Sequence, residues 1–88
     1  MLYKIVLTYQ VKRIIKSWPE SVQLKLTSLV LKLSFGEVLS ASDAKAMTVI
    51  ATSCRELRVK DPAGQYRAFY LLKQPHGVII FHAFQKKT

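Results

Sequence analysis

Apolar residues recur at helical spacing in the first half of the chain. One stripe follows an i, i+3, i+4, i+7 pattern and consists of Val11, Ile14, Ile15 and Trp18. A second stripe consists of Val22, Leu26, Leu29, Val30 and Leu33. Such stripes are typical of amphipathic helices that pack one face on a core. The pattern therefore predicts two consecutive helices, the first with a basic side formed by Lys12, Arg13 and Lys16.

Local signals set the limits of the second predicted helix. Ser17 and Glu20 have the spacing of a capping box, which predicts that the helix begins there. Gly36 is well placed to end it, because glycine readily adopts the left-handed conformation that follows a helix. Leu24 and Leu31 lie off the apolar stripe. They indicate either a wide buried face or a docking surface for a partner.

In the second half of the chain, apolar residues recur with a period of two instead of the helical period. Apolar and charged residues alternate strictly over residues 56–60, which is typical of a strand with one dry face and one wet, basic face. Residues 61–64, Asp-Pro-Ala-Gly, predict a turn. Residues 65–73 and 78–85 predict two further strands, separated by residues 74–77. These three strands would form an antiparallel meander.

The remaining segments complete the predicted fold. Residues 2–8, LYKIVLT, predict a strand that would join the same sheet. Residues 37–53 are interpreted mostly as loop, although residues 42–43 could cap a short helix through Met47. Together the elements predict one α+β domain over residues 1–88, with two N-terminal helices packed on an antiparallel sheet of three to four strands.

Charge narrows the class of partner. The chain carries 14 Lys and Arg against 5 Asp and Glu, a formal net charge of +9. Such a surface attracts nucleic acid, an anionic membrane surface or an acidic protein. The membrane is the weakest of these, because no apolar run approaches the roughly 20 residues that a spanning helix needs. No secretory signal is recognisable, so we expect a cytoplasmic protein with no membrane partner.

Cysteine and histidine restrict the chemistry. Cys54 is the only cysteine, so neither an intrachain disulfide nor a cysteine-based zinc site can form. We expect Cys54 to be a half-buried small hydrophobe, which is the commoner role, rather than a catalytic thiol. His76 and His82 have no suitable companions for a metal site. Any catalysis is therefore expected to be independent of metal ions and cofactors.

Arg58 and Arg67 lie on adjacent predicted strands across a four-residue turn. Hairpin geometry could bring both guanidinium groups to the same face of the sheet. Two such groups on a rigid sheet would hold a phosphodiester and stabilise the charge that grows on it during cleavage. Because the sequence does not fix the register, the pair could equally be two solvated charges.

His82 stands in an otherwise apolar run, where it could be a hydrogen-bonded core residue or a general acid or base. The two arginines and the lysine pair at residues 86–87 favour the second interpretation. Cleavage of RNA needs a base for the 2′-hydroxyl, cations for the pentavalent phosphate and an acid for the leaving 5′-oxygen. Tyr66, Phe69 and Tyr70 lie among the basic residues, and we expect no more than one of them to stack an unpaired base.

Three short blocks of sequence carry a family resemblance. They read RELRVKD at residues 55–61, GQYRAFY at residues 64–70 and FHAFQKKT at residues 81–88. In this order and spacing they resemble the toxins of the RelE superfamily, in particular the HigB-like, phage-related branch with its E-L-R-x-x-D, G-x-Y-R-x-x-Y and H-A-F-x-K-K-T patterns. The resemblance covers the chain from about Leu2, loosely in the helices and closely from Glu56 onward.

The resemblance implies a toxin of a type II toxin–antitoxin system. Such toxins are endoribonucleases that cleave messenger RNA, usually on the ribosome, and are neutralised by an antitoxin that often has a helix-turn-helix domain. Among the motif residues it implies catalytic roles for Arg58, Arg67, His82 and Lys86. The role of the histidine varies among relatives. The residues expected to contact RNA are Lys60, Tyr66, Tyr70 and Lys87.

Two alternatives and one departure stay open. A toxin of the same scaffold could inhibit gyrase without cutting RNA, as the ParE branch does, or the domain could be an inactive module that binds RNA or an antitoxin. Relatives usually continue past the third block into a further helix, whereas the sequence stops at Thr88. We therefore expect a domain that lacks this helix, through truncation, a naturally short chain or decay of activity.

Overall fold

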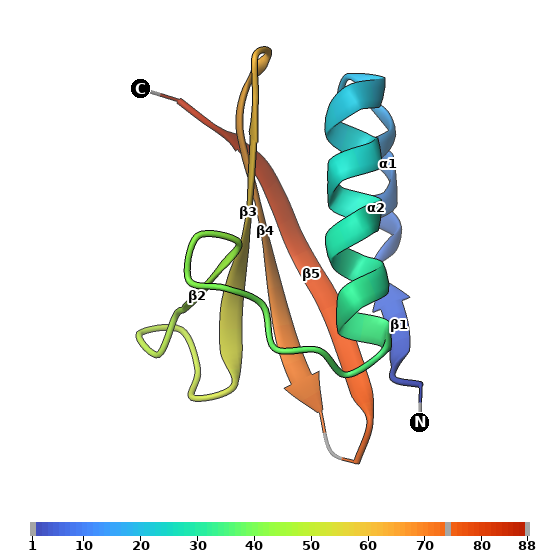
Figure 1. Ribbon diagram of the computed structural model, residues 1–88, viewed down its shortest axis with the longest axis vertical. Coiled ribbons are helices and arrows are strands. Elements are labelled where there is room, and N and C mark those ends of the chain that lie inside the picture. Colours follow the sequence, from blue (N-terminus) through green and yellow to red (C-terminus); the bar gives the residue numbers. More distant parts are fainter. Residues whose placement is uncertain (1, 74, 88) are drawn as a thin grey trace.

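Two helices and five strands make up the structure, a computed structural model that describes residues 2–73 and 75–87. Figure 1 labels them in chain order. They are β1 (Lys4–Leu7), α1 (Tyr9–Lys16), α2 (Glu20–Ser34), β2 (Ala44–Ala46), β3 (Cys54–Asp61), β4 (Gly64–Lys73) and β5 (Gly77–Lys86). No helix of the described residues is long and apolar enough to cross a membrane.

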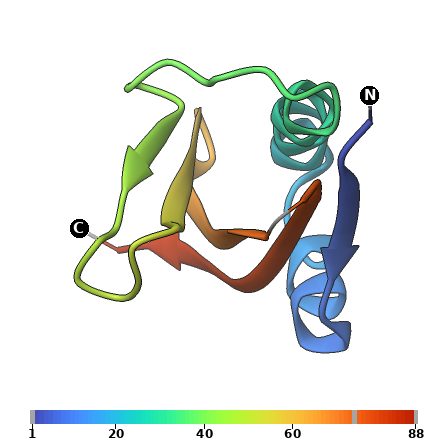
Figure 2. The same ribbon diagram turned by 90° about the horizontal axis from the view of Figure 1, so that it is seen from below.

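The strands form one sheet in the order β1-β5-β4-β3-β2, and both helices cover the same face of it (Figures 1 and 2). The predicted α+β class, with two helices on a sheet, is confirmed. The sheet is larger than predicted and mixed, because β1 pairs parallel with β5 whereas the other pairs are antiparallel.

The segment predicted mostly as loop contains β2. Its three residues pair with residues 55–57 of β3. A strand this short leaves no alternation in the sequence, so only the pairing partner reveals it. The alternative of a short helix through Met47 is wrong, because residues 44–46 are extended. The three strands β3, β4 and β5 follow the predicted ranges closely.

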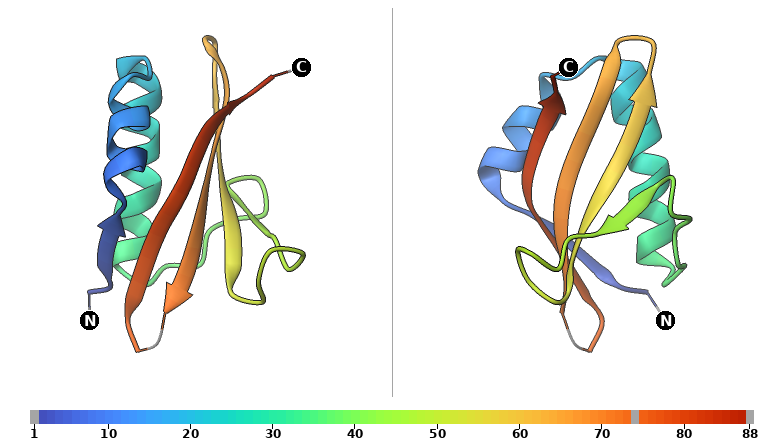
Figure 3. Two further views of the ribbon diagram at one scale, coloured as in Figure 1. Left: turned by 180° about the vertical axis from the view of Figure 1, so that it is seen from behind. Right: turned by 90° about the vertical axis from the view of Figure 1, so that its left-hand side faces the viewer.

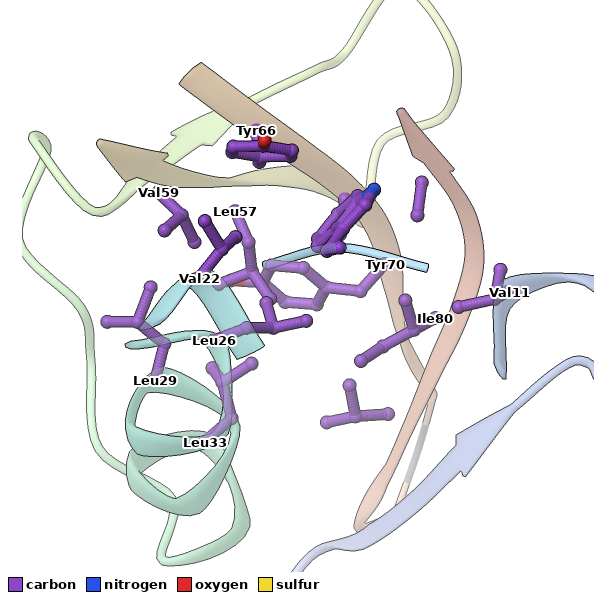
Figure 4. Close-up of a cluster of buried hydrophobic side chains, with 14 residues drawn as sticks. Val11, Val22, Leu26, Leu29, Leu33, Leu57, Val59, Tyr66, Tyr70 and Ile80 are labelled. Atoms are coloured by element: carbon purple, nitrogen blue, oxygen red, sulfur yellow. The ribbon is translucent and has the colours of Figure 1, made fainter. Parts of the chain in front are cut away.

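The core lies between the helices and the sheet (Figure 4). From α2 it receives the buried stripe Val22, Leu26, Leu29 and Leu33, as the periodicity predicts. From the sheet it receives Leu57, Val59, Tyr66, Ala68, Tyr70, Val78, Ile80 and Ala83. We call this side the inner face of the sheet. Cys54 is completely buried rather than half-buried, and burial raises the pKa of its thiol.

The helix junction differs from the prediction. Ser17 ends α1, because its hydroxyl donates to the carbonyl of Ile14 at 2.5 Å, and Pro19 occupies the position before α2 without a side-chain cap. The predicted capping box is therefore wrong, because the Ser17 hydroxyl bonds to the first helix and does not cap the second. Gly36 ends the second helix as predicted, with φ at 77°.

Leu24 and Leu31 point away from the core. Their exposed fractions are 65% and 54%, so the interpretation of a wide buried face is wrong. Both residues belong to α2, whose buried stripe lies on its opposite side. The helix therefore presents two large apolar side chains to solvent.

Candidate functional site

The face of β3, β4 and β5 that lies away from the helices carries the polar residues of the predicted site. We call it the outer face, and Figure 3 (right) views it directly. Side chains alternate between the two faces along a strand, so the register fixes the neighbours. Across the three strands the outer-face rows are Lys60, Gln65 and Lys86; Arg58, Arg67 and Phe84; and Glu56, Phe69 and His82.

Arg58 and Arg67 are direct partners in the β3–β4 hairpin. Their side chains therefore lie on the same face, which is the geometry that an anion site needs. The register follows from the turn at residues 61–64, where Gly64 supplies a φ of 139°. Like charges placed directly opposite each other destabilise a sheet unless a counter-charge or a ligand lies between them.

Glu56 supplies that counter-charge. Its Oε1 accepts a hydrogen bond from Arg58 Nε at 3.2 Å and lies 3.8 Å from Arg67 Nε. The side chains of Glu56 and Arg67 are 10% and 5% exposed, whereas that of Arg58 is 28% exposed. One carboxylate therefore holds two guanidinium groups in a partly desolvated place, where charges interact more strongly than in water. The trio retains one net positive charge.

Arg67 keeps an unused donor. Its Nη2 donates to Gln65 Oε1 at 3.0 Å, but its Nη1 is buried without a hydrogen-bond partner. A buried donor left unpaired costs roughly 1–3 kcal/mol. An anion bound at the arginine pair would remove that cost if it accepted a hydrogen bond from Nη1.

His82 is exposed on the outer face, which excludes the interpretation as a core residue. A β-bulge produces this orientation. Phe69 pairs with His82 and Tyr70 pairs with Ile80, so Phe81 between them has no partner on β4. If alternation continued unbroken from Ile80, the imidazole would face the helices. The bulge turns the imidazole to the outer face, which also carries the arginines, and bulges near functional sites are often used in this way.

The rings around His82 form an aromatic surface beside the charged trio. Its imidazole lies 5.6 Å from the ring of Phe69 and 5.4 Å from that of Phe84, measured between centroids. Phe84 is the register partner of Arg67, so the aromatic and cationic groups are neighbours. Aromatic rings next to cations suit unpaired bases next to phosphates.

The lysines predicted for this site lie at one end of the outer face. Lys60 and Lys86 are both register partners of Gln65, and both are exposed. Lys87 follows β5 and is also exposed. They extend the positive charge of the site toward the turn between β3 and β4.

Tyr66 and Tyr70 lie on the inner face, beneath the helices. Their exposed fractions are 3% and 2%, and the ring of Tyr66 packs against Trp18 at 4.8 Å. Desolvation by burial raises the pKa of the Tyr70 hydroxyl, although nearby Arg55 lowers it. The prediction that these two tyrosines contact RNA is not supported, because neither ring can receive a base. Phe69 is the aromatic residue of this strand that faces outward.

Sequence reasoning missed three members of the site. The sequence could have indicated Glu56, because it lies two residues before Arg58 in the alternating strand and therefore on the same face. Phe84 had no such signal, because its orientation depends on the bulge. Lys45 in β2, the register partner of Glu56, belongs to a strand that was not predicted. In the described ranges, no group of three His, Cys, Asp or Glu side chains is placed to hold a metal ion.

The fold is that of RelE toxins. The free E. coli toxin RelE carrying two arginine-to-alanine substitutions matches with a TM-score of 0.72 and 13% identity, over 97% of this chain and 84% of that one. The isolated E. coli RelE toxin matches with 0.71 and 13%, over 98% and 86%. The RelBE2 toxin–antitoxin complex from Mycobacterium tuberculosis matches with 0.58 and 18%, over 98% and 100%.

The family is defined by sequence. The model of the family described as phage-derived Gp49-like protein (DUF891) matches residues 13–88, and the chain therefore belongs to this family. A comparison with curated proteins gave no match.

Proposed function

We propose that the protein is the toxin of a toxin–antitoxin system and cleaves messenger RNA on the outer face without a metal ion. The observation that carries the proposal is the pair Arg58 and Arg67, bridged by Glu56 and placed beside the exposed His82. This combination provides cations for a phosphodiester and a group that exchanges protons. The RelE fold supports the same reaction class by analogy.

In the proposed reaction the scissile phosphate lies against the two guanidinium groups. The 2′-oxygen of the RNA attacks phosphorus and loses its proton to a base, the bond from phosphorus to the 5′-oxygen breaks, and that oxygen takes a proton. The products are a 2′,3′-cyclic phosphate and a free 5′-hydroxyl. His82 is the imidazole that exchanges protons, Glu56 positions the arginines, and Lys86 adds positive charge. Lys60 and Lys87 contact neighbouring phosphates.

The arginines of β3 allow a matched test. Arg58 lies on the outer face, whereas Arg55 is the register partner of Tyr70 and lines a cavity on the inner face. Arg58→Ala is expected to reduce the single-turnover cleavage rate about 10²-fold or more, because it removes a transition-state cation. Arg55→Ala should cleave like the parent. Equal rates for parent and Arg58→Ala would place the site elsewhere.

The cellular reaction is tested by mapping the 5′ ends of transcripts after induction. Arg67→Ala should relieve growth arrest and remove new 5′ ends within coding sequences, provided that circular dichroism shows the fold intact. We also propose that cleavage occurs in the cytoplasm on ribosome-bound message, so free message should be cut more slowly than the same message in translating ribosomes. Arrest with DNA-damage signalling and without new ends would instead indicate inhibition of gyrase.

We further propose an antitoxin partner with a helix-turn-helix domain. Exposed Leu24 and Leu31 on α2, together with the net charge of +9, suit an apolar and acidic segment. The RelBE2 protein was solved as a toxin–antitoxin complex. Coexpression with the product of a neighbouring short gene should restore growth. Leu24→Ser with Leu31→Ser should abolish this rescue, whereas Val49→Ser, which alters an even more exposed apolar side chain, should not.

A further inference from the structure

A groove of about 400 Å³ lies between α2 and the edge of β3. Its polar lining includes Lys25, Ser28, Lys32, Ser42, Arg58 and Lys60. The groove exists because β2 is short. The pairing of β2 with β3 ends at Leu57, and the backbone amide of Arg58 donates to the carbonyl of Asp43 at 2.8 Å. Beyond Arg58, β3 has no paired strand on that side among the described residues. We call this hollow between α2 and β3 the edge groove.

The edge groove is lined by more cationic than anionic side chains. Four of its lining side chains are lysine or arginine, and Asp43 is its one carboxylate. Lys25 is fixed in place, since its Nζ lies 2.9 Å from Asp61 Oδ1 and donates to the carbonyl of Lys60 at 2.9 Å. Lys32 and Lys60 are exposed. Several ammonium groups gathered along a groove, with hydroxyls between them, suit an extended polyanion.

Arg58 connects the edge groove with the outer face. It lines the groove, and it is also the register partner of Arg67 and the ion-pair partner of Glu56. A chain of phosphates held at the arginine pair can therefore continue over the edge of β3 and into the groove.

We propose that the edge groove binds backbone phosphates of the RNA strand on one side of the scissile bond, an inference that rests on the proposed function. The lining contains no aromatic ring, so it contacts the backbone rather than the bases and adds affinity without sequence preference. A peptide strand is disfavoured, because Lys25 already occupies the carbonyl of Lys60 that strand addition would need.

Lys32 allows a well-matched test. It is the basic residue of the last turn of α2, and Lys16 is an exposed lysine in the last turn of α1, so both contribute alike to their helices. The experiment measures binding of 2′-O-methyl RNA, which lacks the attacking hydroxyl and cannot be cut. Parent, Lys32→Gln, Lys32→Arg and Lys16→Gln are compared on oligonucleotides of about four and about twelve residues.

For the twelve-residue RNA, Lys32→Gln should lower the slope of log affinity against log salt by about 0.7, the value for one phosphate contact in a single strand. A slope smaller by about 0.7 means that the affinity changes about fivefold less for each tenfold change in salt concentration. Lys32→Arg and Lys16→Gln should keep the parent slope. Binding of the four-residue RNA should be the same in all four proteins, because it ends before the groove.

Three outcomes would overturn the proposal. In the first, Lys32→Gln binds the long RNA like the parent. In the second, Lys16→Gln loses as much affinity as Lys32→Gln, which would indicate diffuse attraction. In the third, Lys32→Gln weakens a poly-glutamate peptide but not RNA, which would assign the groove to an acidic protein. If the parent binds no RNA of either length, the proposed function itself fails, and the inference fails with it.

Discussion

Glu56 has two effects on Arg58 and Arg67, one in the free protein and one in the proposed complex with RNA. In the free protein its carboxylate neutralises part of their charge, with one oxygen near both Nε atoms of Arg58 and Arg67. In the proposed complex an RNA phosphate would compete for the same donors. The carboxylate is therefore an internal counter-ion that keeps two like charges together until a stronger anion arrives.

Glu56→Gln tests this relation. The change should destabilise the protein by about 1–3 kcal/mol in chemical denaturation, because the partly buried donors of two opposed guanidinium groups lose their shared charged acceptor. Inorganic phosphate should then raise the melting temperature of the variant more than that of the parent, since phosphate can replace the lost charge. Glu37 is an exposed carboxylate, and Glu37→Gln therefore serves as the control. A variant as stable as the parent would show that the carboxylate does not hold the pair.

At the scale of one element, the bulge in β5 decides which way the imidazole of His82 points. Phe81 is the one residue without a partner on β4, and the strand regains regular pairing on both sides of it. Removing this residue leaves every later side chain on its present face. Removing a paired residue would instead turn the following side chains over.

Deletion of Phe81 should therefore yield a folded protein with a moderately lower midpoint of urea denaturation and with His82 still outward. Deletion of Ile79 is the matched control: it shifts the register by one and should abolish folding. Near-ultraviolet circular dichroism and urea denaturation measure both variants. If the Phe81 deletion unfolds as completely as the control, the bulge does not set the orientation.

The same bulge limited how much of the site could be predicted from the sequence. The four-residue turn offered the facing of Arg58 and Arg67 as one of two alternatives, and only the register of the structure decides between them. The facing of His82 could not be read from an apolar run, because the extra residue is defined only by the partner strand. Tyr66 and Tyr70 were misplaced for a related reason, since strand residues near basic ones can face either layer. The three residues of β2 carried no periodicity at all.

Across the whole molecule, the helical layer is tied to the sheet by polar contacts as well as by the core. Asp61, at the end of β3, pairs with Lys25 of α2 at 2.9 Å and accepts hydrogen bonds from Ser21 and from the backbone of Ala63. The bond from the Ala63 amide and the contact with Lys25 lower the pKa of the Asp61 carboxyl. The ion pair with Asp61 also positions Lys25, which is one of the lysines that line the edge groove.

The lowered pKa predicts a pH-dependent stability. A carboxyl whose pKa is depressed by folding stabilises the protein above its unfolded pKa of about 3.9, and this contribution is lost as pH falls through the lower folded value. Asp61→Asn should therefore lower the melting temperature slightly at pH 7, and the difference from the parent should shrink as the pH falls toward 2. A difference that does not change with pH would contradict the ion pair.

The parallel pairing of β1 with β5 joins segments that are made at very different times. Lys4 pairs with Gly77, more than seventy positions later, and β5 is the strand that carries His82. Pairing over such a separation is slow, and it cannot begin before the later strand has left the ribosome. Until β5 has emerged, the sheet therefore lacks the strand that bears its imidazole. In the proposed function, the site on the outer face is therefore complete only after β5 has joined the sheet.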